Sequence, residues 1–212
     1  KIVLTFGKGY SDSYYRNCRM ETGILKYTMD IMNREYRKEL DIVKVTLPEI
    51  KEIPCVTFQK AKELVSEKYQ RKIRAPFDLE PEEEELIGKY FQEECGSDFV
   101  FVTHYPSKKR PFYAMDDPED SRYTLSFDLL YKGLEITTGG QRIHDYQMLK
   151  DKIAAKGMSE EGLEQYLDAF KYGMPPHGGL GIGLERLTMQ LIGEENIRET
   201  TLFPRDLTRL EP

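Results

Sequence analysis

A run of glycines at every second position constrains this chain more than any other feature of its sequence. The segment 178–193 reads GGLGIGLERLTMQLIG. On an extended strand, alternate side chains point to the same face of the sheet. We therefore expect Leu180, Ile182 and Leu184 to point into the core and the intervening glycines to leave a bare backbone surface. The glycines that share this spacing are Gly179, Gly181 and Gly183.

A bare glycine face favours a flat ligand. A planar group such as a purine ring can lie almost against the main chain where no side chain intervenes. Arg186 falls in the first turn of the helix that follows, beside free backbone N–H groups, where a guanidinium can hold a phosphate. A flat ring next to a phosphate indicates ATP. The spacing alone also allows a glycine-rich strand packed under a helix, with Arg186 in an ordinary salt bridge.

Composition limits the class of protein. The chain has 212 residues, of which 39% are hydrophobic and 32% charged, as expected for one globular domain or one domain with an insert. The net charge of −6 gives no general attraction to polyanions, so nucleic-acid binding would need a local site. The three cysteines are widely spaced without a C-x-x-C pair, which argues against a disulfide framework or structural zinc and fits a reducing cytoplasm.

Neither a membrane span nor a signal peptide is expected. No apolar run approaches the roughly 18 residues that cross a bilayer, and the first residues do not form a secretory leader. The chain begins with Lys1 rather than methionine, as a piece of a longer polypeptide would.

The first part of the chain is predicted to hold one strand and three helices. The β-branched segment 1–6 predicts a strand, and GKGYSDS after it predicts a turn. Apolar residues at helical spacing predict a helix over 21–40. A second helix is expected from the N-cap Thr57 to Lys68. Pro81 opens a third helix, and the four glutamates after it are interpreted as its solvated acidic start.

The second part predicts strands in close succession, followed by helices. Strands are expected over 99–103, 111–115, 123–132 and 134–138, with the last two joined at Gly133 as a hairpin. Helices are expected over 145–156, with Asp145 as N-cap, and over 159–172 and 184–192. Strands in a meander with helices against them predict an α+β domain with a mostly antiparallel sheet flanked by helices.

Two carboxylates lie on the predicted hairpin. Asp128 and Glu135 are seven residues apart across the turn at Gly133, so they can approach each other on one face of the sheet. Converging carboxylates near a triphosphate are suitable ligands for Mg²⁺. Thr138 is three residues beyond Glu135 and adds a hydroxyl. The alternative is a pair of exposed strand carboxylates without a ligand.

An arginine follows a loop that contains two glycines. The guanidinium of Arg142, aimed into the pocket, can hold a carboxylate with two parallel hydrogen bonds. We expect His144 and His177 to be structural hydrogen-bonding residues, because binding of a phosphate and a carboxylate by arginines needs no histidine base. Further candidates for the same pocket are Gln141 and the backbone of Gly139 and Gly140.

These segments resemble a known family of enzymes. GLGIGLERL (179–187) is similar to the third signature motif of class II aminoacyl-tRNA synthetases. FDLLYKGLEITTGGQRIHDY (127–146), FKYGMPPHGG (170–179) and LFPRDLTRLEP (202–212) resemble the archaeal and eukaryotic type of aspartyl-tRNA synthetase. The resemblance is strong over 77–212, where we expect the synthetase core. It is weak over 1–76, which we expect to be a strand and helices belonging to the same catalytic domain.

The resemblance implies a fold like that of the class II catalytic core and a set of roles. The activity implied is activation of aspartate with ATP and magnesium, followed by transfer to tRNA, with a homodimer as a possible assembly. Arg142 would pair with the side-chain carboxylate of the aspartate. Arg186 would clamp the terminal phosphate of ATP, and the glycine strand would support adenine. The implied magnesium ligands are Asp128, Glu135, which with Arg186 would also be catalytic, and Thr138, where the family more often has serine.

One part of the family pattern is missing. The second motif, a Phe-Arg-x-Glu hairpin that grips the α-phosphate, is not found before Gly23, and the nearest candidate, Tyr15-Arg16-Asn17-Cys18, lacks both the phenylalanine and the glutamate. The first motif and the anticodon-binding barrel are not recognisable either. The chain is therefore expected to be the C-terminal part of a larger enzyme or a shortened paralogue. Such a paralogue would be an asparagine-synthetase-like ligase or a non-catalytic module that binds aspartate or a nucleotide.

Overall fold

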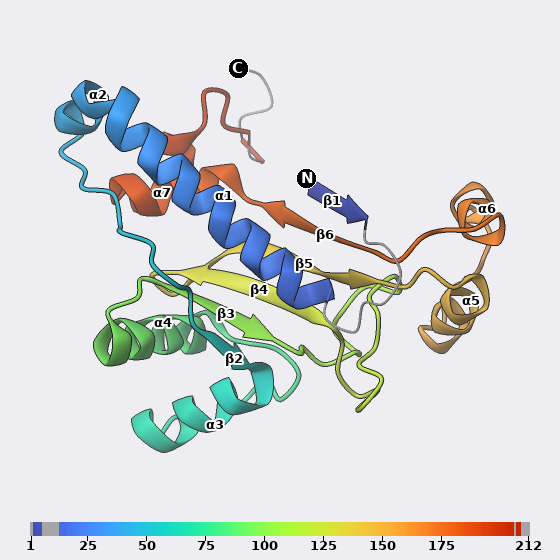
Figure 1. The fold of residues 1–212 in the computed structure, drawn as a ribbon. Helices are drawn as coiled ribbons and strands as arrows, with labels where there is room; N and C mark the ends of the chain where they lie inside the picture. Colours follow the sequence, from blue (N-terminus) through green and yellow to red (C-terminus); the bar gives the residue numbers. More distant parts are fainter. Residues whose placement is uncertain (1, 6–12, 206, 209–212) are drawn as a thin grey trace.

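A single six-stranded sheet organises the molecule (Figure 1). The computed structural model describes residues 2–5, 13–205 and 207–208. The strand order is β1-β6-β5-β4-β3-β2; β2 is parallel to β3, and all other neighbours are antiparallel. The expected α+β fold with a mostly antiparallel sheet is confirmed. The strands are β1 (Ile2–Thr5), β2 (Cys55–Thr57), β3 (Phe99–Thr103), β4 (Ser126–Tyr131), β5 (Leu134–Arg142) and β6 (His177–Ile182).

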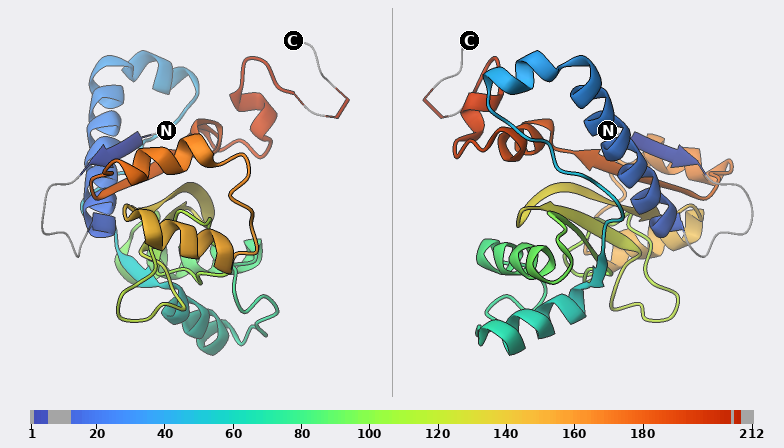
Figure 2. Two further views of the ribbon diagram at one scale, coloured as in Figure 1. Left: turned by 90° about the vertical axis from the view of Figure 1, so that its right-hand side faces the viewer. Right: turned by 60° about the vertical axis from the view of Figure 1, so that its left-hand side comes forward.

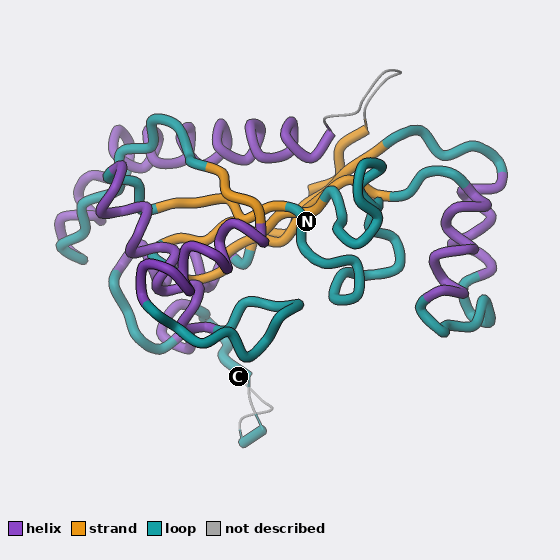
Figure 3. Tube along the Cα trace, turned by 90° about the horizontal axis from the view of Figure 1, so that it is seen from below, coloured by secondary structure: helices purple, strands orange, loops and turns teal. Residues whose placement is uncertain are grey.

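Helices cover the two faces of the sheet unequally. The long helix α1 crosses one face, and α3 and α4 cover the other near β2 and β3 (Figure 2). Helices α5 and α6 form a hairpin beyond one end of the sheet (Figure 3). None of the described helices is both long and apolar enough to cross a bilayer. The helices are α1 (Ser13–Glu35), α2 (Arg37–Ile42), α3 (Phe58–Tyr69), α4 (Pro81–Cys95), α5 (Tyr146–Ala155), α6 (Glu164–Lys171), α7 (Leu184–Ile192) and the 3₁₀-helix η1 (Ile197–Thr200).

Each face of the sheet has its own hydrophobic core. Successive strand residues alternate between the two cores, and a fully buried Leu or Phe contributes roughly 1.5–3 kcal/mol. The core under α1 includes Leu25, Met29, Phe127, Leu129 and Leu180. The core under α3 and α4 includes Val65, Ile87, Val100, Val102 and Leu130. A third, smaller cluster holds α5 and α6 together.

Local signals placed several elements correctly. Thr57 caps α3, because its hydroxyl accepts a hydrogen bond from Lys60 N at 3.3 Å. The β4–β5 hairpin turns at Lys132 and Gly133, whose φ angles are both positive at 48° and 78°. Such a two-residue turn matches the twist of the paired strands, and glycine adopts it without strain.

Several predicted boundaries were wrong. Segment 111–115 is a turn, in which Ala114 N donates to Pro111 O, with one isolated bridge from Ala114 to Arg142. The strand expected from 123 begins only at Ser126. The helix predicted over 159–172 begins at Glu164, after Gly162 with a φ of 82°.

Three further predictions need correction. The helix predicted over 21–40 begins earlier, at Ser13, and is interrupted at Tyr36 before α2. The strand predicted over 134–138 continues to Arg142, so the expected loop before that arginine is strand that pairs with β6. The three-residue strand β2 was not predicted.

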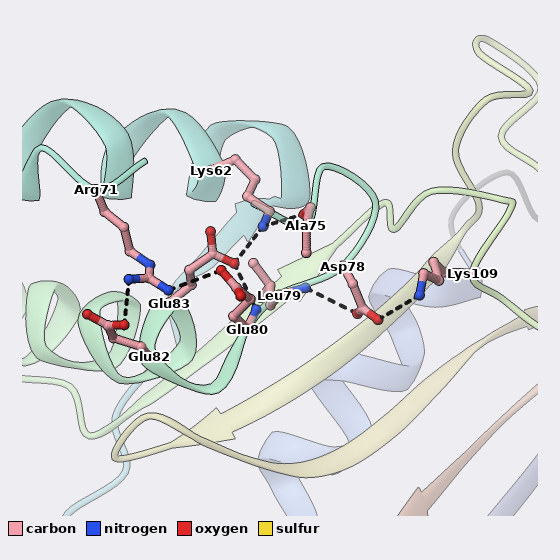
Figure 4. Close-up of polar contacts among 9 residues, drawn as sticks. All are labelled: Lys62, Arg71, Ala75, Asp78, Leu79, Glu80, Glu82, Glu83 and Lys109. Atoms are coloured by element: carbon pink, nitrogen blue, oxygen red, sulfur yellow. Dashed lines mark hydrogen bonds and ion pairs between the residues drawn. The ribbon is translucent and has the colours of Figure 1, made fainter. Parts of the chain in front are cut away.

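The acidic start of α4 is not uniformly solvated, contrary to expectation. Glu83 is fully buried and its carboxylate accepts a hydrogen bond from Lys62 Nζ at 2.6 Å (Figure 4). The same carboxylate accepts from Glu80 N, which closes the N-terminus of the helix. Arg71 pairs with Glu80 and Glu82 alongside (Figure 4). These contacts lock α3, the segment before α4 and α4 itself into one unit.

Candidate functional site

A pocket of about 200 Å³ lies against strands β5 and β6. Phe127 and Leu129 belong to the core under α1, so the intervening Asp128 points to the opposite face of the sheet. In register, Asp128 pairs with Thr138, and Thr138 pairs with Gly181. Residues of three adjacent strands therefore meet on the face away from α1.

The glycines of this face serve different purposes. A side chain at Gly181 would meet no atom within 4 Å, so the backbone there borders open space, as the spacing predicts. A Cβ at Gly140 would lie 2.8 Å from Ser126 Cα, so that glycine is required by strand packing. Gly183 is not part of the strand but caps α7. Leu184 begins that helix and is 68% exposed, so the expectation that it points into the core was wrong.

Three of the predicted site residues contact one another. Arg186 Nη1 donates to the backbone oxygen of Glu135 at 2.7 Å and lies 3.7 Å from its Oε1. Thr138 Oγ1 donates to Glu135 Oε1 at 2.9 Å. Arg186 and Glu135 are both partly exposed, so a ligand can reach them.

Asp128 has a partner that the sequence did not indicate. Arg110 Nη2 donates to Asp128 Oδ2 at 2.7 Å, and the two side chains are only 11% and 8% exposed. The guanidinium lies 3.9 Å from the ring centroid of Tyr105. Burial, and then the charge of Asp128, hold the pKa of Tyr105 well above its usual value. Asp128 Oδ1 is buried without a hydrogen-bond partner among the described residues, and a carboxylate oxygen of this kind suits a hard cation by its chemistry.

A third carboxyl group approaches from α4. Glu84 Oε2 accepts a hydrogen bond from Glu135 N at 3.4 Å. Burial raises the pKa of Glu84 to about 7, with further contributions from the charges of Glu135 and Asp128. In the described part of the chain, no group of three or more His, Cys, Asp or Glu side chains is arranged to hold a metal ion. The oxygens of Asp128 and Glu135 fit Mg²⁺ by chemistry, although they are not gathered in a ready cage.

Where β5 ends, the pocket wall is cationic and aromatic. Arg142 lines it, with the guanidinium 4.8 Å from the ring centroid of Tyr113. His177 pairs with Arg142 in the sheet and its Nδ1 lies 3.0 Å from Pro175 O. Burial lowers the pKa of His177, which suits a structural role. The Nδ1 of His144 is buried without a hydrogen-bond partner in the described residues.

Part of the predicted set lines the pocket wall, whereas Asp128, Glu135 and Arg186 lie next to it through Thr138 and do not line it. Gln141 is buried, and its backbone N–H donates to Leu125 O at 2.9 Å. The pocket wall thus combines predicted residues with Arg110 and Tyr113, which were missed. The predicted residues in the wall are Thr138, Gly139, Gly140, Gln141, Arg142, Gly179 and Gly181.

Comparison with known proteins defines the class. Residues 11–207 match the family model of class II tRNA synthetases (D, K and N). The chain belongs to this family of class II aminoacyl-tRNA synthetases.

Similar proteins within the family are named as aspartate–tRNA ligases. The chain is 44% identical over 206 residues to an aspartate–tRNA(Asp/Asn) ligase of Aeropyrum pernix, covering 96% of this chain and 47% of the relative. It is 47% identical over 199 residues to an aspartate–tRNA(Asp/Asn) ligase of Deinococcus radiodurans, covering 91% and 46%. The chain therefore spans about half the length of these relatives.

Solved structures agree with this grouping. The aspartyl tRNA synthetase of Entamoeba histolytica superimposes with a TM-score of 0.91 and 30% identity, over 99% of this chain and 43% of that one. The asparaginyl-tRNA synthetase of Pyrococcus horikoshii gives 0.86 and 27%, over 99% and 49%. The predicted class II core is confirmed, and a division of the chain at residue 76 stays a prediction.

Proposed function

We propose that this chain binds ATP, Mg²⁺ and aspartate in the pocket on β5 and β6 and forms part of an enzyme that activates aspartate and transfers it to tRNA in the cytoplasm. The observation that carries the proposal is the meeting of Arg186, Glu135 and Thr138 beside the open backbone of Gly181. Family membership and the names of the relatives support the choice of reaction.

Activation is an in-line attack of the aspartate α-carboxylate on the α-phosphorus of ATP, with pyrophosphate as the leaving group. A protein accelerates such a step mainly by positioning the reactants and stabilising charge. Arg186 neutralises charge on the terminal phosphate. Gly179 and Gly181 let the adenine lie against the strand. Asp128 and Glu135, with Thr138 beside them, hold Mg²⁺, which offsets negative charge on the phosphates when bound.

Selection of aspartate is assigned to Arg142. Its guanidinium can form two parallel hydrogen bonds with the side-chain carboxylate of aspartate. Asparagine presents an amide, which cannot return the same ionic pair, so the guanidinium of Arg142 would lose its partner. Arg142 lies at the end of β5, whereas Arg186 contacts Glu135 near its start, and this separation supports separate recognition of amino acid and phosphate.

The proposal is tested by titration calorimetry with ATP and Mg²⁺. Arg186→Ala removes a charge-assisted phosphate contact of about 1.5–3 kcal/mol, so we expect affinity to fall roughly ten- to hundredfold. Arg122→Ala is the matched control, because Arg122 is an exposed arginine paired with Asp120 and does not line this pocket. Equal ATP affinity in parent and Arg186→Ala, or no nucleotide binding by the parent, would contradict the proposal.

A further inference from the structure

Lys156, the residue that caps the C-terminus of α5, holds the backbone of the loop that carries Arg110 into the pocket. Lys156 Nζ donates to Ser107 O at 2.6 Å, to Lys108 O at 3.1 Å and to Arg110 O at 2.7 Å. An ammonium group has three N–H donors. Three carbonyls of one short segment therefore match the full hydrogen-bonding capacity of this single side chain.

A second lysine, one turn earlier on α5, holds the same segment and the chain beyond it. Lys152 is buried, and its Nζ donates to Ser107 Oγ at 2.6 Å and pairs with Asp116. Burial, followed by the nearby charge of Lys152, lowers the pKa of Lys156, while Asp116 opposes this effect. Two ammonium groups placed side by side repel each other, and the carbonyls and the carboxylate compensate for that repulsion.

The held segment is a tight turn. Lys109 N donates to Pro106 O at 3.0 Å and Arg110 N donates to Ser107 O at 3.3 Å. Lys109 Nζ pairs with Asp78 at 3.3 Å on the outside of the molecule (Figure 4). The backbone carbonyls of this turn face α5, whereas the next side chain along, that of Arg110, faces the sheet.

The inward side of the turn forms part of the pocket wall. Arg110 and Tyr113 line the pocket together with Arg142. Arg110 also carries the contact with Asp128, at 2.7 Å. A shift of the turn by about one ångström would change this contact and the shape of the pocket. The contacts that Lys152 and Lys156 make with this turn therefore influence the position of Arg110 in the pocket wall.

We propose that Lys156, assisted by Lys152, is a positioning residue that fixes the turn at 107–110 and so holds the guanidinium of Arg110 at the pocket wall. The consequence for ligand binding rests on the proposed function, whereas the hold on the turn does not. A competing explanation is that the two lysines only attach the α5–α6 hairpin to the rest of the molecule.

Amide hydrogen exchange tests the hold on the turn without any ligand. Lys156→Met removes three hydrogen bonds to a charged donor, so we expect the amides of 107–110 to exchange at least about tenfold faster. Amides of β4 and β5 should be unchanged. Lys150→Met is the matched control on the same helix, because Lys150 pairs with Glu160 at 3.3 Å and not with the loop. Unchanged exchange at 107–110, or an equal increase in both variants, would overturn the inference.

A double-mutant cycle tests the effect on the site. Lys156→Met should weaken binding of aspartate in the presence of ATP and Mg²⁺ about tenfold, measured at a temperature where parent and variant are both folded. In an Arg110→Met background the same change should have little further effect, because the positioned group is gone. Additive losses would show that Lys156 acts elsewhere, which contradicts the proposal. Lys156→Arg, which keeps the charge and its donors, should recover part of the affinity.

The two experiments separate the possible failures. If the parent binds neither ATP nor aspartate, the proposed function fails, and hydrogen exchange still decides whether Lys156 holds the turn. If Arg110→Met does not fold because Asp128 is left buried without its cation, exchange in the Lys156→Met protein again decides.

Discussion

Glu21 combines complete burial with an ionisable carboxyl group. It lies on the sheet-facing side of α1, and neither carboxyl oxygen has a hydrogen-bond partner among the described residues. Burial is the main cause that raises its pKa to about 7; the charge of Asp128 adds to the effect and Thr137 opposes it. One turn earlier, Asn17 Nδ2 donates to Gly140 O at 3.4 Å. A polar layer thus lies directly behind the strand that carries the site.

Replacement of Glu21 should change how stability depends on pH. The folded pKa of about 7 lies above the ordinary value of 4.5, so the folded state keeps a proton that the unfolded state loses. This favourable contribution is present below about pH 4.5 and is lost as pH rises through 7. We expect Glu21→Gln to raise the free energy of unfolding by about 2–3 kcal/mol at pH 8 and little at pH 4. Urea titrations at both pH values measure this, with the exposed Glu67→Gln as control; an equal effect at both pH values would refute the assignment.

Arg142 offers a test of substrate choice at a single side chain. Arg142→Leu should abolish the rise in melting temperature caused by aspartate and leave most of the rise caused by ATP, because the two ligands use different ends of the pocket. Differential scanning fluorimetry measures both. In the parent, asparagine should give a smaller rise than aspartate, since it cannot form the bidentate ionic pair. Equal stabilisation by the two amino acids would count against the role of Arg142.

At the scale of elements, helix α4 and the β4–β5 hairpin pack closely against each other where two glycines, one from each element, meet. A Cβ at Gly88 would lie 2.5 Å from Gly133 N, and one at Gly133 would lie 2.6 Å from Glu85 Cα. This close approach brings Glu84 against Glu135, so the packing of a helix on a turn determines the surroundings of the site.

A methyl group added at this junction should separate the two elements. We expect Gly88→Ala to lower the free energy of unfolding by about 1–3 kcal/mol, because the atoms it would meet belong to backbone. Gly23→Ala is the control, since a Cβ there meets nothing within 4 Å and alanine favours a helix over glycine by about 0.5–1 kcal/mol. Denaturant unfolding measures the free energy of unfolding of both variants. A Gly88→Ala protein as stable as the Gly23→Ala protein would contradict the prediction, because it would show that α4 and the hairpin can move apart at little cost.

Elements with strong local signals were predictable, and those that depend on distant contacts were not. The cap at Thr57 and the turn at Gly133 are determined by a few adjacent residues, so the sequence predicts them. Strand β2 is only three residues long and exists because it pairs with β3. The segment after Pro111 has strand-like composition but folds as a turn.

The same division applies to the site. Glu135 and Arg186 each follow from a local pattern, the hairpin at Gly133 and the alternating glycines, and the structure brings the two side chains into contact. Glu84 and Arg110 reach the site from other elements, and their own neighbours in sequence carry no sign of it. An acidic helix start looks solvated until the fold brings another carboxylate beside it.

At the scale of the whole molecule, one sheet gathers residues from positions 84 to 186 around a single pocket. Among the described residues, Arg110 and Arg142 are the cations that line this pocket, and Arg186 contacts Glu135, whose carboxylate accepts a hydrogen bond from the pocket residue Thr138. Arg110 already forms an ion pair with Asp128, so the positive charge of its guanidinium is largely compensated. Arg19, which directly follows the second-motif candidate in the sequence, lines a different pocket, on the α1 side of the sheet, together with all three cysteines. That position excludes it as a substitute for the phosphate-gripping arginine of the second motif.

Turnover by these 212 residues alone should be absent even where the substrates bind. Developing charge at the α-phosphate must be stabilised by a preorganised donor, and loss of one such donor commonly costs about 2.7–4 kcal/mol. In the proposed assignment Arg186 serves the terminal phosphate and Arg142 serves aspartate, which leaves the α-phosphate without a dedicated cation in the described residues. We therefore expect ATP and aspartate to bind without aspartate-dependent pyrophosphate exchange above background, and no charging of tRNA, even at saturating substrates. If exchange is measured, another arginine must have taken over the α-phosphate. Arg16, which is part of the second-motif candidate in the sequence, or Arg110, released from Asp128, would be that group, and Arg16→Met and Arg110→Met would show which.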